Sequence, residues 1–187
     1  MRFLLDISTP SNILSTNFPN SIHSNKITKN IDKLKEYSRK ANIKYIKAIN
    51  SLDDMLSTSL PAKPIAISSR EYNDIELKNL LLEHKGELFI EKPSNNILKN
   101  DNFNKILSFF TANEIAIFGI SMSEELFSTA IALSGQGIKV SIINDAILPI
   151  NEMELNVKSQ IETVKEKGIL MLQTTKFIQD ENGMHIL

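Results

Sequence analysis

Residues 115–137 read IAIFGISMSEELFSTAIALSGQG, and this stretch decides the fold class. An apolar run ends at Gly119, a short polar segment follows, and a helical pattern of apolar residues then runs to a second glycine. This order predicts a buried strand that turns into a helix with a glycine stop. In open parallel sheets, ligands bind at such junctions outside the carboxyl ends of strands. Ser121, Ser123 and Glu125 are therefore candidate site residues.

The same alternation of strand and helix patterns extends along the chain. Helical patterns lie at 24–42, 75–86, 101–113, 123–137, 151–168 and 174–179. Strand patterns lie at 2–8, 43–49, 64–68, 87–92, 114–120 and 139–145, and the run 169–173 is a candidate last strand. Repeated alternation predicts a parallel sheet covered by helices on both faces. We therefore expect an α/β protein with three α-β-α layers and a mostly parallel, six-stranded, Rossmann-like sheet, in a single domain spanning residues 1–187.

The composition argues against several classes of protein. The chain has 187 residues, a net charge of −1 and a pI of about 6.3, and none of these values favours nucleic acid or an anionic membrane as a partner. It contains no cysteine, which excludes disulfides, thiolate metal sites and a thiol nucleophile. The N-terminal apolar run is too short for a signal peptide, and no stretch approaches the ~18 apolar residues of a membrane span. We therefore expect a cytoplasmic protein.

Polar residues at the carboxyl ends of the predicted strands are the main functional candidates. Asp6 ends the first strand and Lys92 the fourth, while Asn144 and Asp145 end the sixth. The chain has no GxGxxG or GxxxxGK[ST] phosphate loop and no GxSxG motif, and its three histidines lack metal-binding spacing. The residues therefore predict neither a cofactor nor a metal.

Five segments occur in an order that is typical of one known family. They are FLLDIS (3–8), ITKNIDKLKEYSRKANIKYIKA (27–48), LFIEKPSNNIL (88–98), IAIFGISMSEELFSTAIALSGQGIKVSIINDAI (115–147) and ETVKEKGILMLQTTKFI (162–178). In this order they resemble the isochorismatase-like (cysteine hydrolase) family. The resemblance implies the family's fold, with Asp6 as the catalytic aspartate and Lys92 as the catalytic lysine. It also implies a homodimer or larger homo-oligomer that acts on a small molecule.

The nucleophile is the main departure from this family. In its amidase branch, the nucleophilic cysteine follows the signature glycine by six residues, and six residues after Gly119 this chain has Glu125. Isochorismatases proper also lack the cysteine and use the aspartate as an acid, but their aromatic–Ala–His segment is replaced here by SMS (121–123). The metal-binding histidines of the nicotinamidase branch have no counterpart. The resemblance therefore transfers Asp6 and Lys92 but not the nucleophile.

Each candidate residue also has a purely structural interpretation. Asp6 could cap a loop or form a salt bridge, and Lys92 could be a solvated lysine at a strand end. An acidic residue in a helix's first turn stabilises the helix dipole, which suits Glu125 with Ser123 as the cap. Arg70 could bind a substrate carboxylate through its forked guanidinium, or it could be a surface residue.

From these residues we expect a metal-independent small-molecule hydrolase that works without a cysteine. In this hypothesis Asp6 is the general acid or base, Lys92 sets its pKa, and Glu125 is a second carboxylate of the site. The substrate contacts come from the other candidates, Ser121, Ser123 and Arg70. The alternative is a catalytically inactive protein of the same fold that binds a ligand or serves as an assembly partner. What distinguishes the two is how Asp6, Lys92 and Glu125 face one another.

Overall fold

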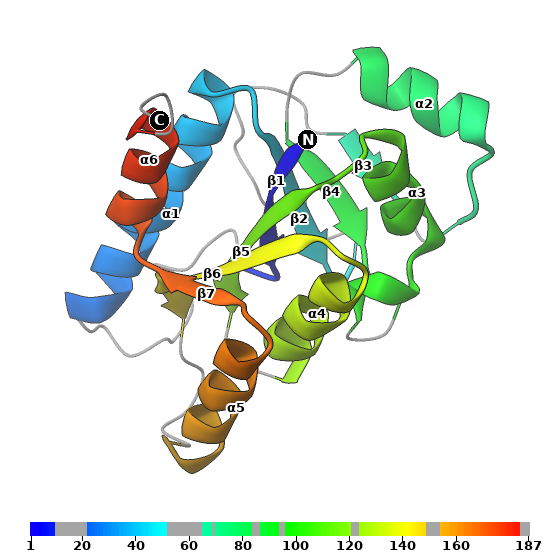
Figure 1. Cartoon of the computed structure of the whole chain (residues 1–187). Helices are drawn as coiled ribbons and strands as arrows, with labels where there is room; N and C mark the ends of the chain where they lie inside the picture. Colours follow the sequence, from blue (N-terminus) through cyan, green and yellow to red (C-terminus); the bar gives the residue numbers. More distant parts are fainter. Residues whose placement is uncertain are drawn as a thin grey trace.

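The computed structural model describes residues 1–9, 22–51, 65–68, 70–83, 87–93, 96–120, 124–148 and 154–183. Within these residues the chain forms one seven-stranded sheet flanked by helices (Figure 1). The strands are β1 (Arg2–Ile7), β2 (Lys44–Ile49), β3 (Ile65–Ile67), β4 (Leu88–Glu91), β5 (Glu114–Ile120), β6 (Lys139–Leu148) and β7 (Leu170–Leu172).

The strands lie in the order β3-β4-β2-β1-β5-β6-β7, and all six pairings between them are parallel. The predicted α/β class is therefore confirmed, with seven strands where the sequence predicts six. The additional strand is the candidate at the C-terminal side, β7, which pairs with β6 at the edge of the sheet. The chain builds outward from β1 through β2 on one side and later through β5 on the other. The boundary between β1 and β5 is thus a switch point, where open α/β sheets bind ligands.

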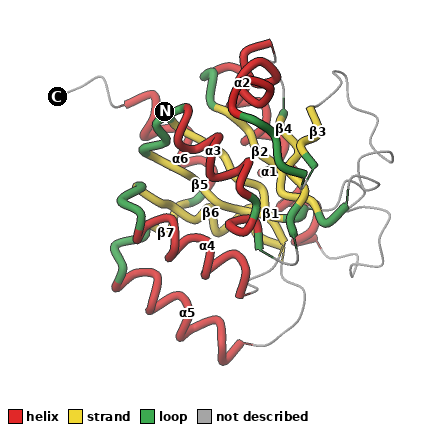
Figure 2. The backbone as a smooth tube through the Cα atoms, turned by 90° about the vertical axis from the view of Figure 1, so that its right-hand side faces the viewer, coloured by secondary structure: helices red, strands yellow, loops and turns green. Residues whose placement is uncertain are grey.

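Helices cover both faces of the sheet (Figures 1 and 2). They are α1 (Ile22–Lys40), α2 (Asp74–Glu83), α3 (Asp101–Phe109), α4 (Glu124–Gly135), α5 (Glu154–Glu166) and α6 (Thr174–Gly183), and the 3-10 helix η2 (Ile97–Lys99) precedes α3. Helices α1 and α6 share one hydrophobic core with the sheet, and α2 to α5 share the core on the opposite face. Among the described residues no helix has the length and apolar character needed to cross a bilayer.

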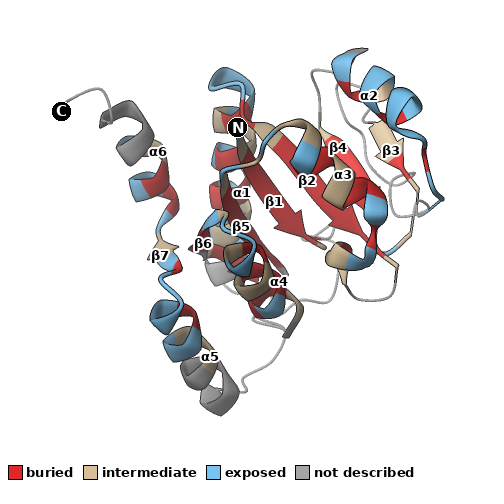
Figure 3. Cartoon of the chain, turned by 45° about the vertical axis from the view of Figure 1, so that its right-hand side comes forward, coloured by how far each residue is buried: buried red, intermediate tan, exposed pale blue. Residues whose placement is uncertain are grey.

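The central strands are apolar on both faces because both faces are covered. In β1, Phe3 and Leu5 point into the core of α2 to α5, while Leu4 points into the core of α1 and α6. Figure 3 shows the central strands β1, β2 and β4 as almost continuously buried, with exposed residues on the outer surfaces of the helices. Asp6 follows the same alternation as Leu4, so its carboxylate lies on the α1 side of the sheet.

Gly119 allows β1 and β5 to approach closely at the switch point. Its φ is +132°, and a Cβ built on it would lie 2.3 Å from the carbonyl oxygen of Ile7. Only glycine fits both this backbone conformation and this space. The signature glycine of the opening stretch therefore has a packing role, because it lets the chain leave β5 beside the end of β1 and enter α4.

Candidate functional site

A buried ion pair joins two of the predicted site residues. Lys92 directly follows β4, and its Nζ donates to both carboxylate oxygens of Glu125, at 2.8 Å to Oε1 and 2.7 Å to Oε2. Glu125 lies in the first turn of α4. The side chain of Lys92 is 2% exposed and that of Glu125 is 12% exposed. At the junction between β5 and α4, the Glu125 carboxylate therefore points inward to Lys92. Part of the Glu125 side chain remains accessible to solvent.

Ser8 completes the environment of the lysine. Lys92 Nζ also donates to Ser8 Oγ at 2.6 Å. An ammonium group has three N–H donors, and these contacts supply three acceptors. Ser8 has φ +59°, which is the left-handed region, and its amide donates to Ala48 O at 3.0 Å. This turn after β1 holds the serine in place under Lys92.

Asp6 is fully buried and has different partners. Its Oδ2 accepts a hydrogen bond from the hydroxyl of Tyr45 at 2.6 Å, and its Oδ1 accepts one from the amide of Thr9 at 3.1 Å. Burial raises the pKa of the Tyr45 phenol well above its ordinary value, and the nearby Asp6 charge raises it further, so Tyr45 remains a protonated donor. Among the described residues no ion pair joins Asp6 to Lys92. Lys92 therefore pairs with Glu125, and Asp6 is held by Tyr45 and Thr9 instead of by the lysine.

Thr9 carries a polar atom that the fold leaves unpaired. Its hydroxyl is buried and has no hydrogen-bond partner, although its amide binds Asp6. Most buried polar atoms in folded proteins are hydrogen-bonded, so this hydroxyl is an exception, which it shares with the buried hydroxyls of Thr129 and Ser141.

The side chain of Asn100 fixes the backbone at the end of β4, next to Lys92. The side chain of Asn100 donates to Glu91 O at 2.6 Å, and its Oδ1 accepts from the amides of Asn102 and Phe103 at the start of α3. The amide of Lys92 donates to Ile49 O at 2.8 Å. The lysine backbone is therefore held both by the neighbouring strand and by the cap of α3.

The remaining predicted site residues lie elsewhere or outside the described part of the chain. Ser121 and Ser123 lie outside the described residues. Arg70 is exposed, on the connection between β3 and α2, with its guanidinium carbon 4.2 Å from the centre of the Tyr72 ring. Asp145 turns away toward α6, where its Oδ1 accepts from the amide and hydroxyl of Thr174 at 2.7 and 2.8 Å.

Two residues of the cluster escape a sequence-based search. Ser8 becomes an acceptor only through its left-handed turn, which no local motif encodes. Tyr45 lies near the start of β2. A buried tyrosine hydroxyl usually needs a partner, which is the one signal that points to it. Among the described residues no group of three or more His, Cys, Asp or Glu side chains is arranged to hold a metal ion.

Comparisons with known proteins find similarity in structure. No protein-family model matches the sequence, and no curated protein matches it by sequence. An isochorismatase-like hydrolase from Alkaliphilus metalliredigens superposes with a TM-score of 0.66 at 12% identity, over 96% of this chain and 98% of that one. The nicotinamidase SaPncA from Staphylococcus aureus superposes with a TM-score of 0.64 at 16% identity, over 92% of this chain and 97% of that one.

The YcaC gene product of Escherichia coli, described as an octameric hydrolase of unknown specificity, is also similar. It superposes with a TM-score of 0.61 at 17% identity, over 92% of this chain and 74% of that one. The chain therefore has the isochorismatase-like hydrolase fold. At these identities the likeness concerns the fold alone, so chemistry has to be argued from the side chains of the site.

Proposed function

We propose that this chain is a small-molecule hydrolase of the isochorismatase-like family that works without a cysteine nucleophile, with Glu125 as the general base. The observation that carries the proposal is the bidentate contact of Lys92 with Glu125 at the junction of β5 and α4. This contact supports a site in which the Glu125 carboxylate takes the place of the nucleophilic thiolate of the amidase branch. Hydrogen bonds from an ammonium group to a carboxylate are charge-assisted and are stronger than those between neutral groups.

The reaction follows from the exposure of the two carboxylates. Glu125 is partly exposed, whereas Asp6 is completely buried. Glu125 accepts a proton from a water molecule as the water oxygen bonds to the scissile carbonyl carbon and the carbonyl π electrons move onto its oxygen. When the tetrahedral intermediate collapses, the leaving group departs with the proton that Glu125 returns. No covalent enzyme intermediate forms, which matches the weak nucleophilicity of a carboxylate.

Asp6 takes a positioning role in this proposal. By accepting from the Thr9 amide and the Tyr45 hydroxyl, it fixes the turn that carries Ser8, and Ser8 is the third acceptor of Lys92. From the sequence alone, Asp6 is expected to be the general acid or base. In this proposal Glu125 has that role.

The test is a comparison of two carboxylate variants on a defined substrate panel. Nicotinamide, p-nitrophenyl acetate and an alkyl vinyl ether would be screened with the wild type, Glu125→Gln, Asp6→Asn and the control Glu36→Gln, whose carboxylate pairs with Lys40 on the surface. We expect Glu125→Gln to reduce kcat about 10²–10⁴-fold, the range for removal of a general base. The control keeps full activity, and a metal chelator leaves wild-type turnover unchanged. If only Asp6→Asn lost activity, the base would be Asp6 and the assignment to Glu125 would be wrong.

A second candidate function is supported by the saturation of Lys92. All three of its N–H donors are used within the protein, so it offers none to a substrate unless the pair opens. This supports an inactive protein of the same fold that binds a ligand or an assembly partner. Absence of turnover across the panel, together with saturable binding of one of its members, would favour this candidate. For either candidate we propose a homodimer or larger homo-oligomer, which size-exclusion chromatography with light scattering would measure.

A further inference from the structure

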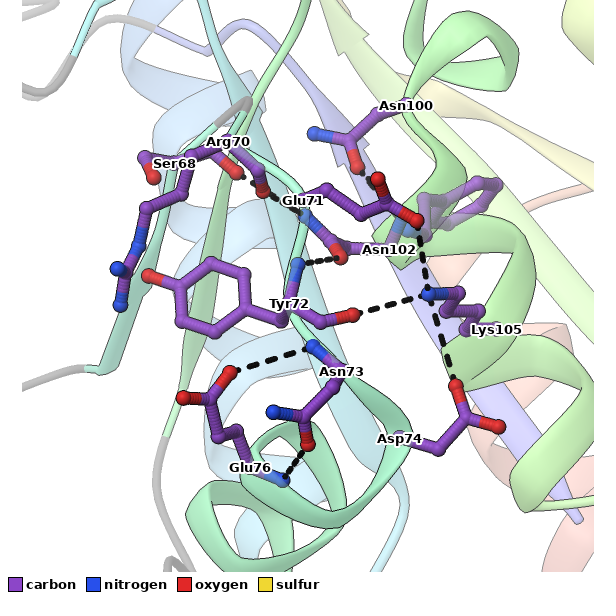
Figure 4. A network of polar contacts seen from close by, with 11 residues as sticks. Ser68, Arg70, Glu71, Tyr72, Asn73, Asp74, Glu76, Asn100, Asn102 and Lys105 are labelled. Atoms are coloured by element: carbon purple, nitrogen blue, oxygen red, sulfur yellow. Dashed lines mark hydrogen bonds and ion pairs between the residues drawn. The ribbon is translucent and has the colours of Figure 1, made fainter.

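Arg70 differs from the other arginines of the chain. The sequence contains three arginines, at positions 2, 39 and 70. Arg2 pairs with Glu114 at 3.0 Å and Arg39 with Glu87 at 3.6 Å. Arg70 is exposed and makes no ion pair with any carboxylate of the described residues. Its guanidinium instead lies over the ring of Tyr72 (Figure 4).

The acidic residues near Arg70 are engaged elsewhere. Glu76 forms a reciprocal cap with Asn73, in which Asn73 Oδ1 accepts from the Glu76 amide at 2.9 Å and Glu76 Oε2 accepts from the Asn73 amide at 3.2 Å. Glu71 and Asp74 lie 3.8 and 3.5 Å from Lys105 Nζ. Figure 4 shows the contacts with Lys105 on the side of the connection away from the guanidinium, whereas the carboxylate of Glu76 lies on the same side as Arg70. The charge of Glu76 still acts on Arg70, but none of these three carboxylates forms an ion pair with its guanidinium.

The backbone that carries Arg70 is clamped. The side chain of Asn102, which is buried, donates to Arg70 O at 2.7 Å and to Ser68 O at 3.2 Å, and it accepts from the Tyr72 amide at 3.3 Å. Lys105 Nζ donates to Tyr72 O at 2.9 Å. An exposed side chain on so restrained a backbone has less conformational entropy to lose when it binds a ligand.

Tyr72 restrains the guanidinium itself. Burial raises the pKa of the Tyr72 phenol, but the Arg70 guanidinium and the Ser68 side chain beside it outweigh burial, so the pKa lies below its ordinary value. The Tyr72 side chain stacks on the guanidinium and also forms a hydrogen bond with it, which holds the guanidinium in place. A guanidinium has five N–H donors, so donors remain for a ligand.

The clamp also connects Arg70 to the ion pair. Asn102 holds the connection after β3, and Asn100, two residues earlier on the same turn, holds Glu91 next to Lys92. Strand β3 is the neighbour of β4, so the two connections leave the sheet roughly 5 Å apart at the backbone. The start of α3 thus fixes Arg70 and Lys92 relative to each other at the edge of the sheet where the site lies.

We propose that Arg70, held by Tyr72 and Asn102, is the recognition residue for a carboxylate on the substrate, whose hydrolysable group is placed at Glu125. This inference rests on the proposed function only for the claim that Glu125 acts on the hydrolysable group of the substrate. The binding of a carboxylate by Arg70 does not depend on it. A guanidinium matches a carboxylate with two parallel hydrogen bonds. A single unpaired positive charge fits a monoanion better than a phosphate dianion, because the nearby Lys105 lies beside two carboxylates of its own.

A binding experiment tests the proposal without turnover. Acetate, benzoate and succinate would be titrated into the full chain by calorimetry or by NMR chemical shifts, with acetamide, benzamide and succinamide as uncharged counterparts. We expect at least one acid to bind tighter than its amide. Arg70→Lys, which keeps the charge but loses the fork, should weaken that acid about tenfold or more. The matched control Arg39→Lys, on a surface arginine with its own carboxylate, should leave its affinity unchanged.

The possible outcomes separate this proposal from the proposed function. If no acid binds tighter than its amide, or if Arg70→Lys binds it like the wild type, the role of Arg70 is overturned, whatever the hydrolytic activity. Glu125→Gln should still bind the acid within about twofold, so loss of turnover in that variant tests only the base. Urea unfolding of Arg70→Lys shows whether its fold is intact. Phosphate binding that is stronger than binding of any carboxylate also overturns the proposal.

Discussion

At the scale of single residues, the central question is what the pair of Lys92 and Glu125 does for stability. Both side chains are largely removed from water, and their mutual attraction offsets a desolvation penalty that each would otherwise bear. Breaking such a pair from one side leaves the other charge uncompensated, whereas replacing both partners by apolar groups removes both penalties. The ion pair of Lys92 and Glu125 is therefore better explained by a role in the proposed site than by a contribution to the stability of the fold.

We expect Lys92→Met to lower the free energy of unfolding by about 3–5 kcal/mol, since it leaves the Glu125 carboxylate buried without a cation. The double variant Lys92→Met/Glu125→Leu should recover most of that loss. Urea unfolding at pH 7 measures both values. Glu36→Gln, which breaks an exposed pair, is the matched control and should be close to the wild type. A double variant as unstable as the single one would contradict this account.

Tyr45 gives a pH-dependent prediction. Its pKa is raised in the folded protein by burial and by Asp6, so the stability it contributes is fully present below the unfolded pKa of about 10 and is lost as the pH rises through the folded pKa. Tyr45→Phe should cost about 1–3 kcal/mol at pH 7, because the buried Asp6 loses a donor. The stability difference from the wild type should shrink above pH 10.

Urea unfolding at pH 7 and pH 10.5 measures this change. Leu82→Ala, at an exposed position of α2 without a titratable group, is the control. Tyr72, whose pKa is lowered, is present in every variant, so its own titration cancels in the differences. A constant difference across the pH range would mean that Asp6 does not depend on the phenol.

The sequence predicts much of the site, but not its pairing. Position at a strand end identifies Asp6 and Lys92, and the spacing from Gly119 identifies Glu125. From the sequence we expect Lys92 to set the pKa of Asp6, and how the two residues face each other is left open. In the structure, the register of β1 and β2 brings Tyr45 near Asp6 across 39 residues of chain. Such pairing depends on which strands are neighbours, and a single sequence does not encode that order locally.

At the scale of elements, glycine at position 119 decides how closely β1 and β5 approach. Gly119→Ala would place a methyl group 2.3 Å from the Ile7 carbonyl oxygen and force a positive φ on alanine. Since the obstacle is backbone, we expect a loss of about 3 kcal/mol or more in the free energy of unfolding. Gly135→Ala, at the C-terminal end of α4 with open space around it, should instead gain about 0.4–1 kcal/mol. Equal effects of the two variants in thermal unfolding would disprove the close approach.

Element boundaries are predicted well where local chemistry sets them and poorly where tertiary contacts do. Helix α3 ends at Phe109 rather than near residue 113, and Thr111 follows with φ +45°. Strand β6 continues to Leu148 rather than ending at residue 145, because its register with β5 shifts between Ile117 and Gly119. Such bulges depend on the partner strand, so hydrophobic periodicity does not reveal them.

At the scale of the whole molecule, the candidate site is formed by separate segments that meet at one edge of the sheet. Ser8 follows β1, Lys92 follows β4, and Glu125 begins α4 after β5. The alternation of strands and helices predicts that these ends share an edge, because all strands of a parallel sheet point the same way. It does not predict that the three side chains touch, since that depends on the order of the strands and on the turn at Ser8.

If the fold retains the electrostatic environment of a cysteine hydrolase, a cysteine placed at position 125 should have a lowered thiol pKa. The chain has no cysteine, so Glu125→Cys would carry a single thiol, and its alkylation by iodoacetamide as a function of pH would give its pKa directly. Lys92 and the first turn of α4 should lower that pKa clearly below the ordinary value of about 8.5. Ser128→Cys, exposed on the next turn of the same helix, should keep an ordinary pKa. Adding Lys92→Gln should raise the pKa of Cys at position 125 again. Equal values for the two thiols would mean that the fold retains the backbone of the family but not its activating field, which would favour the inactive candidate over the hydrolase.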